Sequence, residues 1–376
     1  MDPRDLESLV EQCAAMLLSD DVNILDKGIQ ILRGKYIVTA SKQAEQLARI
    51  AQEIAVYNGG VVLKKLWEGL QLRTSEGCPK PPTTYSTGCN FALSILSSNK
   101  VVVERCLKIL GAKERLAARD IYRTLSGMAV QEARSLKRIG AAVEGPSFNT
   151  LRFGTRLRNI CNFAEASRVF REGMKDVAEE QSIFETLGYL VSPEFLSKLT
   201  AFDSWKLRDL LSRLVESLAI AKDSQLWALD KGLLKLIAAI LEGSPVKEPN
   251  LSPNFKPDGS PNQSCAASLV FLLETEAGVE KMRAHNALSG LKPHKQKING
   301  APLNRSWNYI ETRMQGKHAA LGALRYVGRW KLKQSGDGYV VLPVVCSWKL
   351  CTAGPETAGK KFGKCALCQV SRYCRL

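Results

Sequence analysis

Apolar residues recur three and four positions apart along most of residues 4–240, and runs of strict apolar–polar alternation are absent there. This period places apolar side chains on one face of a helix. It is clear in five stretches: DLESLVEQCAAMLL, QAEQLARIAQEIAVY, VVLKKLWEGL, VVVERCLKIL and KLRDLLSRLVESLAIA. The sequence therefore predicts a mainly α fold over residues 1–242, with breaks at Asn58-Gly59-Gly60, at the CPKPP stretch, at Gly111 and at Gly145-Pro146.

Similar helix starts recur about 40 residues apart in this region, at Gly59, Asn99 and Gly140. The spacing lies in the range of armadillo and HEAT arrays, in which each repeat buries its apolar face against its neighbours. The stretch TLRFGTRLRNICNFAEASRVFREG resembles the third helix of an armadillo repeat. We therefore expect an armadillo- or HEAT-like α-solenoid or, alternatively, an irregular helical array. A solenoid would display a long surface that binds other proteins.

Two segments of different composition follow this helical region. Residues 243–263 carry a proline at every fourth position, which favours an extended linker: Pro245, Pro249, Pro253, Pro257 and Pro261. Helical periodicity resumes over residues 264–335. From Lys281 onward there are 18 Lys and Arg against three acids, whereas the chain up to Glu280 holds 35 against 34. This basic excess indicates either a solvated face or contact with nucleic acid or an acidic partner.

Nucleic-acid binding by segment 281–335 is the alternative function. Phosphate neutralisation needs cations, and base stacking needs exposed aromatic rings. The segment interleaves its cations with four aromatic residues: Trp307, Tyr309, Tyr326 and Trp330. However, the apolar spacing of HAALGALRYVGRW also fits packing into a core, and no nucleic-acid-binding fold is legible.

The cysteines fall into two groups. Six stand alone, mostly in helical patterns, as small core residues do: Cys13, Cys78, Cys89, Cys106, Cys161 and Cys265. The other five of the eleven lie close to the C-terminus, as Cys-x4-Cys, Cys-x2-Cys and one more: Cys346, Cys351, Cys365, Cys368 and Cys374. Close cysteine pairs joined by turns let two sulfurs point at one tetrahedral ion with little chain strain. These five residues are the expected ligands of a structural Zn²⁺.

The stretch VVCSWKLCTAGPETAGKKFGKCALCQVSRYCRL resembles the first two-thirds of a MYND-type zinc finger. Phe362, Lys364 and the Tyr373-Cys374 pair stand where that family has them. The family binds two cross-braced zinc ions and continues with further cysteine and histidine ligands, which this sequence lacks. We therefore expect residues 336–376 to form a small, incomplete cysteine-rich module.

Two ligand arrangements remain open for this module. By the pairing of the family, Cys346, Cys351 and Cys374 would hold one ion, and Cys365 and Cys368 would hold the other. The alternative is a single four-thiolate site without Cys374. In either case a zinc closed by protein ligands has no open position for water, so it would stabilise the fold and perform no chemistry.

The expected function is that of a non-enzymatic interaction scaffold or adaptor. No phosphate-binding loop, dinucleotide fingerprint, zinc-protease motif or nucleophile elbow is present, and there are only three histidines. The resemblance implies that the finger binds proline-containing peptides, often Pro-x-Leu-x-Pro. The chain itself contains such a peptide, Pro249-Asn250-Leu251-Ser252-Pro253. Other proteins are thus the expected partners.

The N-terminus MDPRDLESLVEQ lacks both the basic start and the apolar run of a signal peptide. No later stretch reaches the roughly 18 apolar residues of a membrane-spanning helix. We expect an intracellular protein of the cytoplasm or nucleus without membrane contact, in which thiols stay reduced.

Overall fold

A computed structural model describes residues 3–34, 43–71, 84–139, 150–177, 183–246, 260–299 and 306–317, together with two short strands near the C-terminus. The described chain is mainly helical. It divides into two compact units, Met1–Gly243 and Ser244–Leu376, which are described separately below. No described helix is long and apolar enough to cross a lipid bilayer.

The helices of the first unit confirm the expected mainly α region. They are α1 (Pro3–Leu17), α2 (Val22–Leu32), α3 (Gln43–Val56), the 3₁₀ turn η2 (Tyr57–Gly59), α4 (Val61–Leu70), α5 (Thr84–Leu96), α6 (Lys100–Ile109), α7 (Glu114–Ile139), α8 (Thr150–Ala166), α9 (Arg168–Lys175), α10 (Ile183–Tyr189), α11 (Pro193–Leu196), α12 (Ala201–Ile220), α13 (Lys222–Asp230) and α14 (Leu233–Gly243).

The turn between α3 and α4 lies where the sequence predicted a break. Asn58, Gly59 and Gly60 all have positive φ values, of 43°, 72° and 89°. This left-handed backbone favours Gly and Asn. A Cβ at Gly60 would also lie 2.7 Å from Cδ1 of Ile109, so the turn approaches the end of α6 closely.

Short polar side chains set several helix starts. The side chains of Asp21, Asn99, Ser167 and Thr200 each accept a hydrogen bond from a backbone N–H in the first turn of α2, α6, α9 and α12. Such caps satisfy donors that the helix itself leaves free. The Ser167 cap also divides the stretch that resembles one armadillo helix into two helices, α8 and α9.

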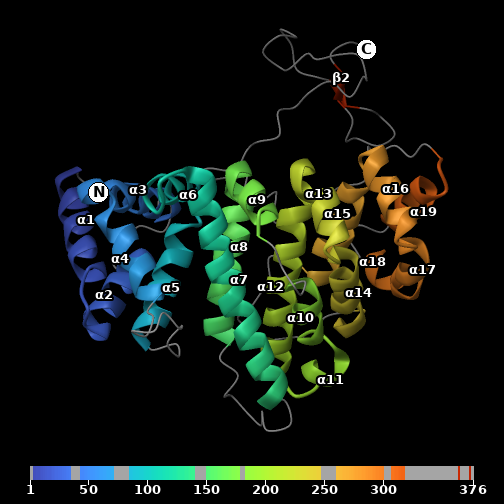
Figure 1. Cartoon of the computed structure of the whole chain (residues 1–376), viewed down its shortest axis with the longest axis horizontal. Coiled ribbons are helices and arrows are strands. Elements are labelled where there is room, and N and C mark those ends of the chain that lie inside the picture. Colours follow the sequence, from blue (N-terminus) through green and yellow to red (C-terminus); the bar gives the residue numbers. More distant parts are fainter. Residues whose placement is uncertain are drawn as a thin grey trace. The chain divides into compact units, whose positions relative to one another are not determined.

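A row of packed helices runs through the first unit (Figure 1). Helix α2 packs on α5, α5 on α8, and α8 on α12. The remaining helices pack beside this row, for example α4 on α5 and α7 on α8 and α9. Members of the row start at Val22, Thr84, Thr150 and Ala201, so their starts are unevenly spaced and lie farther apart than the expected repeat.

The expected spacing of about 40 residues does not correspond to this row. Gly59 and Asn99 precede α4 and α6, which lie outside the row, and Gly140 is outside the described residues. Helix α4 packs mainly on α5, whereas α6 packs on α3, α7 and α8, so their positions are not equivalent. The similar sequences at Gly59 and Asn99 form two short amphipathic helices that begin after Gly or Asn, and the expected repeat stays a prediction.

A buried polar network fixes α5 against α8. The amide of Asn159 donates to Oδ1 of Asn90 at 2.8 Å and to the Asn90 carbonyl at 3.2 Å, and its Oδ1 accepts from Ser97 at 2.9 Å. Asn90 in turn donates to Thr155. All four side chains are buried. Because these groups satisfy each other only in one register, they determine how the two helices pair.

The second unit contains α15 (Pro261–Leu272), α16 (Glu276–Ala284), α17 (Ala287–Leu291), η3 (Lys292–His294), α18 (Lys295–Ile298), α19 (Ser306–Met314) and the strands β1 (Gly363–Lys364) and β2 (Arg372–Tyr373). Helix α15 begins inside the expected linker, because Ser260 and Gln263 form a capping box with Pro261 in the first turn. The apolar period after Cys265 is interrupted at residues 273–275, where Thr275 caps α16.

The two ends of the proline-rich segment are joined within this unit. The side-chain amide of Asn262 donates to the carbonyl of Pro245 at 2.9 Å. Residues 247–259 lie between these ends, outside the described residues, and include the Pro-x-Leu-x-Pro peptide. The two described ends of the segment are therefore in contact, and the expected linker between them stays a prediction.

Candidate functional site

The five expected zinc ligands lie outside the described residues: Cys346, Cys351, Cys365, Cys368 and Cys374. The described strands lie among them in sequence. β1 and β2 are antiparallel, with Gly363 opposite Tyr373 and Lys364 opposite Arg372. The connection between them, 365–371, contains the Cys-x2-Cys pair, and Cys374 follows Tyr373 directly. The donor set and the closed connection fit a thiolate-bound zinc ion.

The solitary cysteines are core residues wherever the structure describes them. Cys13, Cys89, Cys106, Cys161 and Cys265 are buried free thiols, as expected, and Cys78 lies outside the described residues. Burial raises the pKa of Cys13 and of Cys106 to about 12, and that of Cys89 to about 11. Within the described ranges, no three His, Cys, Asp or Glu side chains gather as a metal site.

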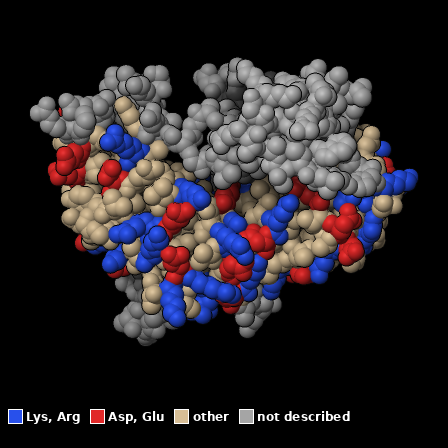
Figure 2. Space-filling view, turned by 90° about the horizontal axis from the view of Figure 1, so that it is seen from above, with Lys and Arg blue, Asp and Glu red and all other residues tan. Residues whose placement is uncertain are grey.

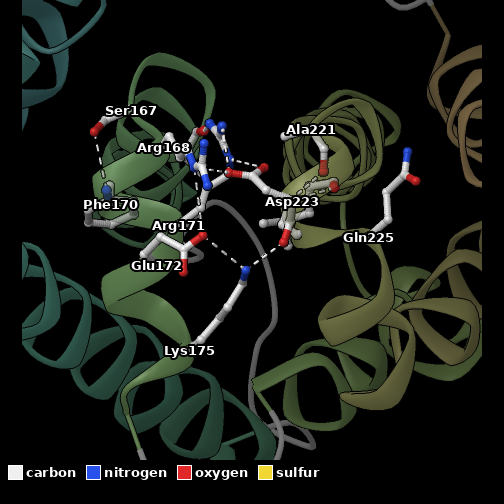
Figure 3. Close-up of polar contacts among 12 residues, drawn as sticks. Ser167, Arg168, Phe170, Arg171, Glu172, Lys175, Ala221, Asp223 and Gln225 are labelled. Atoms are coloured by element: carbon white, nitrogen blue, oxygen red, sulfur yellow. Dashed lines mark hydrogen bonds and ion pairs between the residues drawn. The ribbon is translucent and has the colours of Figure 1, made fainter.

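Figure 3 shows a dense set of ion pairs, which joins α9 to α13 around Asp223. Arg171 donates from Nε and Nη2 to the two carboxylate oxygens of Asp223, at 2.8 and 3.1 Å. Lys175 donates to the Asp223 carbonyl at 2.5 Å and lies 3.4 Å from Glu172. Arg168 lies at the rim of the set, 4.0 Å from Asp223.

This Asp223 cluster is internally satisfied. Both oxygens of its carboxylate accept from Arg171, whose remaining Nη1 donates to the Ala164 carbonyl at 2.6 Å. Bidentate pairing of this kind fixes geometry as well as charge. Since donors and acceptors are matched within the cluster, we interpret it as a structural contact that holds α9 against α13.

A second charged group lies on the row, between α8 and α12, and its charges are less balanced. The partly exposed residues of α8 include a stripe at helical spacing: Gly154, Arg158, Asn162 and Glu165. Those of α12 include a parallel stripe: Phe202, Lys206, Asp209 and Arg213. Gly154 approaches Leu210, and the charge of Arg213 acts on Arg158, so the two stripes lie side by side. We call this surface the α8–α12 face.

Arg158 is the least well-matched cation of this face. Its Nε is buried and has no hydrogen-bond partner among the described residues. Burial, and then the charge of Arg213, lower the pKa of Arg158 below the usual range of arginine. Asp209 is the nearby carboxylate, and it already lies 3.5 Å from Nε of Arg213. The charges of Arg213 and of Asp209 both act on Arg158, and Asp209 is also the ion-pair partner of Arg213.

The aromatic residues proposed for base stacking are partly accounted for. Trp307 and Tyr309 on α19 are 1% and 6% exposed, so neither presents a ring face to a ligand. Tyr326 and Trp330, and the HAALGALRYVGRW stretch with Leu321 and Leu324, lie outside the described residues. On the side of the molecule that Figure 2 shows, the Lys and Arg residues of the described part are interspersed with Asp and Glu.

Comparison with known proteins gives no family for this chain. No protein-family model matches it, and no curated protein matches it. Among solved structures, one similar chain comes from the crystal structure of an engineered protein of the Northeast Structural Genomics Consortium. The match has a TM-score of 0.31 and 15% sequence identity, and it covers 82% of this chain and 77% of that chain. A likeness at this level carries no argument about fold or function.

Sequence reasoning missed both charged groups. Asp223, Arg158 and Arg213 each resemble ordinary charges of amphipathic helices, which usually face solvent. Their contacts are made between helices that are distant in sequence, such as α9 with α13 and α8 with α12. No local signal in the sequence distinguishes these charges from their solvated neighbours.

Proposed function

We propose that this chain is a non-enzymatic interaction adaptor in which an armadillo-like α-solenoid is followed by a MYND-like, zinc-stabilised module. The helical part of the proposal is supported by the row α2–α5–α8–α12, because each member packs on the next along the chain. Stacking of successive helical repeats against their neighbours is how solenoids build a continuous core and an extended binding surface.

The zinc part of the proposal rests on one observation, the pairing of β1 with β2 around the Cys-x2-Cys pair. Five thiols at metal-ligand spacing between Cys346 and Cys374, with two of them between paired strands, make Zn²⁺ the fitting ion. A closed thiolate site stabilises its module and leaves no coordination position for a substrate. The module would then act by binding peptides of the Pro-x-Leu-x-Pro type.

Zinc content tests this part of the proposal. We expect the purified chain to carry about one zinc or more by elemental analysis, and the C365S/C368S variant to lose zinc. The matched control is C161A, which removes a buried thiol outside the cluster. A chain without zinc, or a double variant that retains all of it, would contradict the assignment.

Peptide binding tests the interaction role. A labelled Pro-Asn-Leu-Ser-Pro peptide should bind the zinc-loaded chain and lose affinity when zinc is removed by a chelator or by C365S/C368S. The control peptide replaces both prolines with alanine. Equal affinity for the two peptides, or affinity independent of zinc, would count against a MYND-like module. Salt-sensitive retention of random oligonucleotides would instead favour the basic segment 281–335.

A further inference from the structure

The α8–α12 face differs from the Asp223 cluster and from the pair of Arg115 with Asp176 in what it leaves unmatched. In the Asp223 cluster, each carboxylate oxygen and the backbone carbonyl accept from a cation. In the pair of Arg115 with Asp176, both carboxylate oxygens also accept, at 2.6 and 2.7 Å. On the α8–α12 face, Arg158 and Arg213 share Asp209 as their nearby carboxylate.

An unmatched cation that is partly buried is costly. Taking a guanidinium out of water is unfavourable unless hydrogen bonds and an opposite charge replace the lost solvation. Nε of Arg158 has neither water contact nor a hydrogen-bond partner among the described residues, and Arg213 adds a like charge nearby. Arg158 as a whole is partly exposed, so an external carboxylate that reaches the accessible part of its side chain would supply the missing negative charge.

We propose that the α8–α12 face binds an acidic peptide, with a peptide carboxylate held between Arg158 and Arg213. Arg recognises a planar carboxylate through two parallel N–H donors, which a single guanidinium on a flat helix face can present. The inference rests on the proposed role of the helical row as an interaction surface, and it does not depend on the zinc module.

Neighbouring residues of the face favour a peptide over an isolated anion. Phe202 is half-buried on α12, and Nζ of Lys206 lies 5.2 Å from the centre of its ring, which gives an apolar contact and a second cation along the same stripe. Gly154 is half-exposed, and a Cβ there would contact only Leu210, at 3.5 Å. The backbone of α8 is therefore uncovered one turn before Arg158, where an extended chain can approach.

The test compares variants of the full chain by fluorescence anisotropy with the labelled peptide Glu-Ser-Glu-Ser-Glu-Ser-Glu. Its control replaces every Glu with Gln. Because the whole chain carries a net charge of +16, acidic peptides also bind it without specificity, so the difference between variants is the readout. We expect R158Q and R213Q each to weaken binding about tenfold, in line with the loss of a charge-assisted hydrogen bond.

R168Q is the matched control, since it removes one positive charge from a side chain that is 78% exposed and makes only long contacts. It should change affinity less than twofold, the small effect of a single solvent-exposed charge. Equal losses in R158Q and R168Q would overturn the proposal, as would equal binding of the Glu and Gln peptides. Binding of a phosphoserine peptide but not of the Glu peptide would also overturn it.

Two further measurements separate this inference from other failures. Thermal unfolding of R158Q should begin at the same temperature as that of the native chain or higher, because the charge that it removes is poorly solvated. Removal of zinc by a chelator should leave binding of the Glu peptide unchanged. If that binding disappeared with zinc, the peptide site would belong to the C-terminal module, and the assignment to α8 and α12 would be wrong.

Discussion

At the scale of single residues, the side-chain amide of Asn159 stabilises the packing of α8 on α5. It bonds to Asn90 on α5 and to Ser97 directly after that helix, and all three side chains are buried. Removing it takes one hydrogen-bond partner from each of these buried groups, which is more costly than the loss of a solvent-exposed contact.

We predict that N159A lowers the free energy of unfolding by about 2–4 kcal/mol, since two buried polar groups each lose a hydrogen-bond partner. Urea denaturation followed by circular dichroism measures this change. N162A is the control, because Asn162 bonds to Ser94 and Ser97 but is partly exposed, so water can replace its amide. A loss in N162A as large as that in N159A would contradict the role of the buried network.

Thiol reactivity is a second prediction at this scale. Thiols react as thiolates, and burial raises the pKa values of Cys13, Cys89 and Cys106 to about 11–12. We expect these three to resist a thiol-specific dye in the folded chain at pH 8 and to react once the chain is unfolded. Mass spectrometry of labelled peptides identifies them, and rapid native labelling of Cys106 would show that the first unit opens readily.

At the scale of elements, close contact between α7 and α9 depends on a residue without a side chain. A Cβ on Gly173 of α9 would lie 2.7 Å from both Cβ of Ala118 and the backbone nitrogen of Arg119. Such a distance to a backbone atom cannot be relieved by a rotamer change. The two helices would have to move apart.

We predict that G173A destabilises the chain by about 1–3 kcal/mol through this overpacking. Gly127 on α7 is the matched control: it is exposed, and an added Cβ there meets no atom within 4 Å. G127A should therefore stabilise the chain by about 1 kcal/mol, the gain in helix propensity from Gly to Ala. The two variants should shift the thermal midpoint in opposite directions, and shifts of the same sign would refute the contact.

At the scale of the whole molecule, the proposed metal and the helical core should be energetically separate. The described helices contain no group of metal-ligating side chains, and the first unit is held by its own buried apolar residues. A chelator should therefore leave the helical circular dichroism signal and the main thermal transition unchanged while it releases zinc. A fall of that signal on chelation would place a metal dependence inside the helical part.

Apolar periodicity was enough to predict a mainly helical chain and several of its ends. The breaks at Asn58-Gly59-Gly60 and Gly111 are confirmed, because left-handed backbone and short turns depend on residues adjacent in sequence. The cysteine cluster is also a purely local pattern, and its assignment to zinc stays a prediction. The breaks expected at the CPKPP stretch and at Gly145-Pro146 lie outside the described residues.

Packing between distant helices is what the tertiary structure alone decided. It placed Asn159 against Asn90, Arg171 against Asp223 and Arg158 near Arg213, and it arranged the described helices in a row whose members start at uneven intervals. The physical reason is that a helical period fixes which face of a helix is apolar but not which helix covers it. Burial and charge pairing depend on which helices pack together. The sequence by itself therefore determined the helices, and the tertiary structure determined the contacts between them and the α8–α12 face.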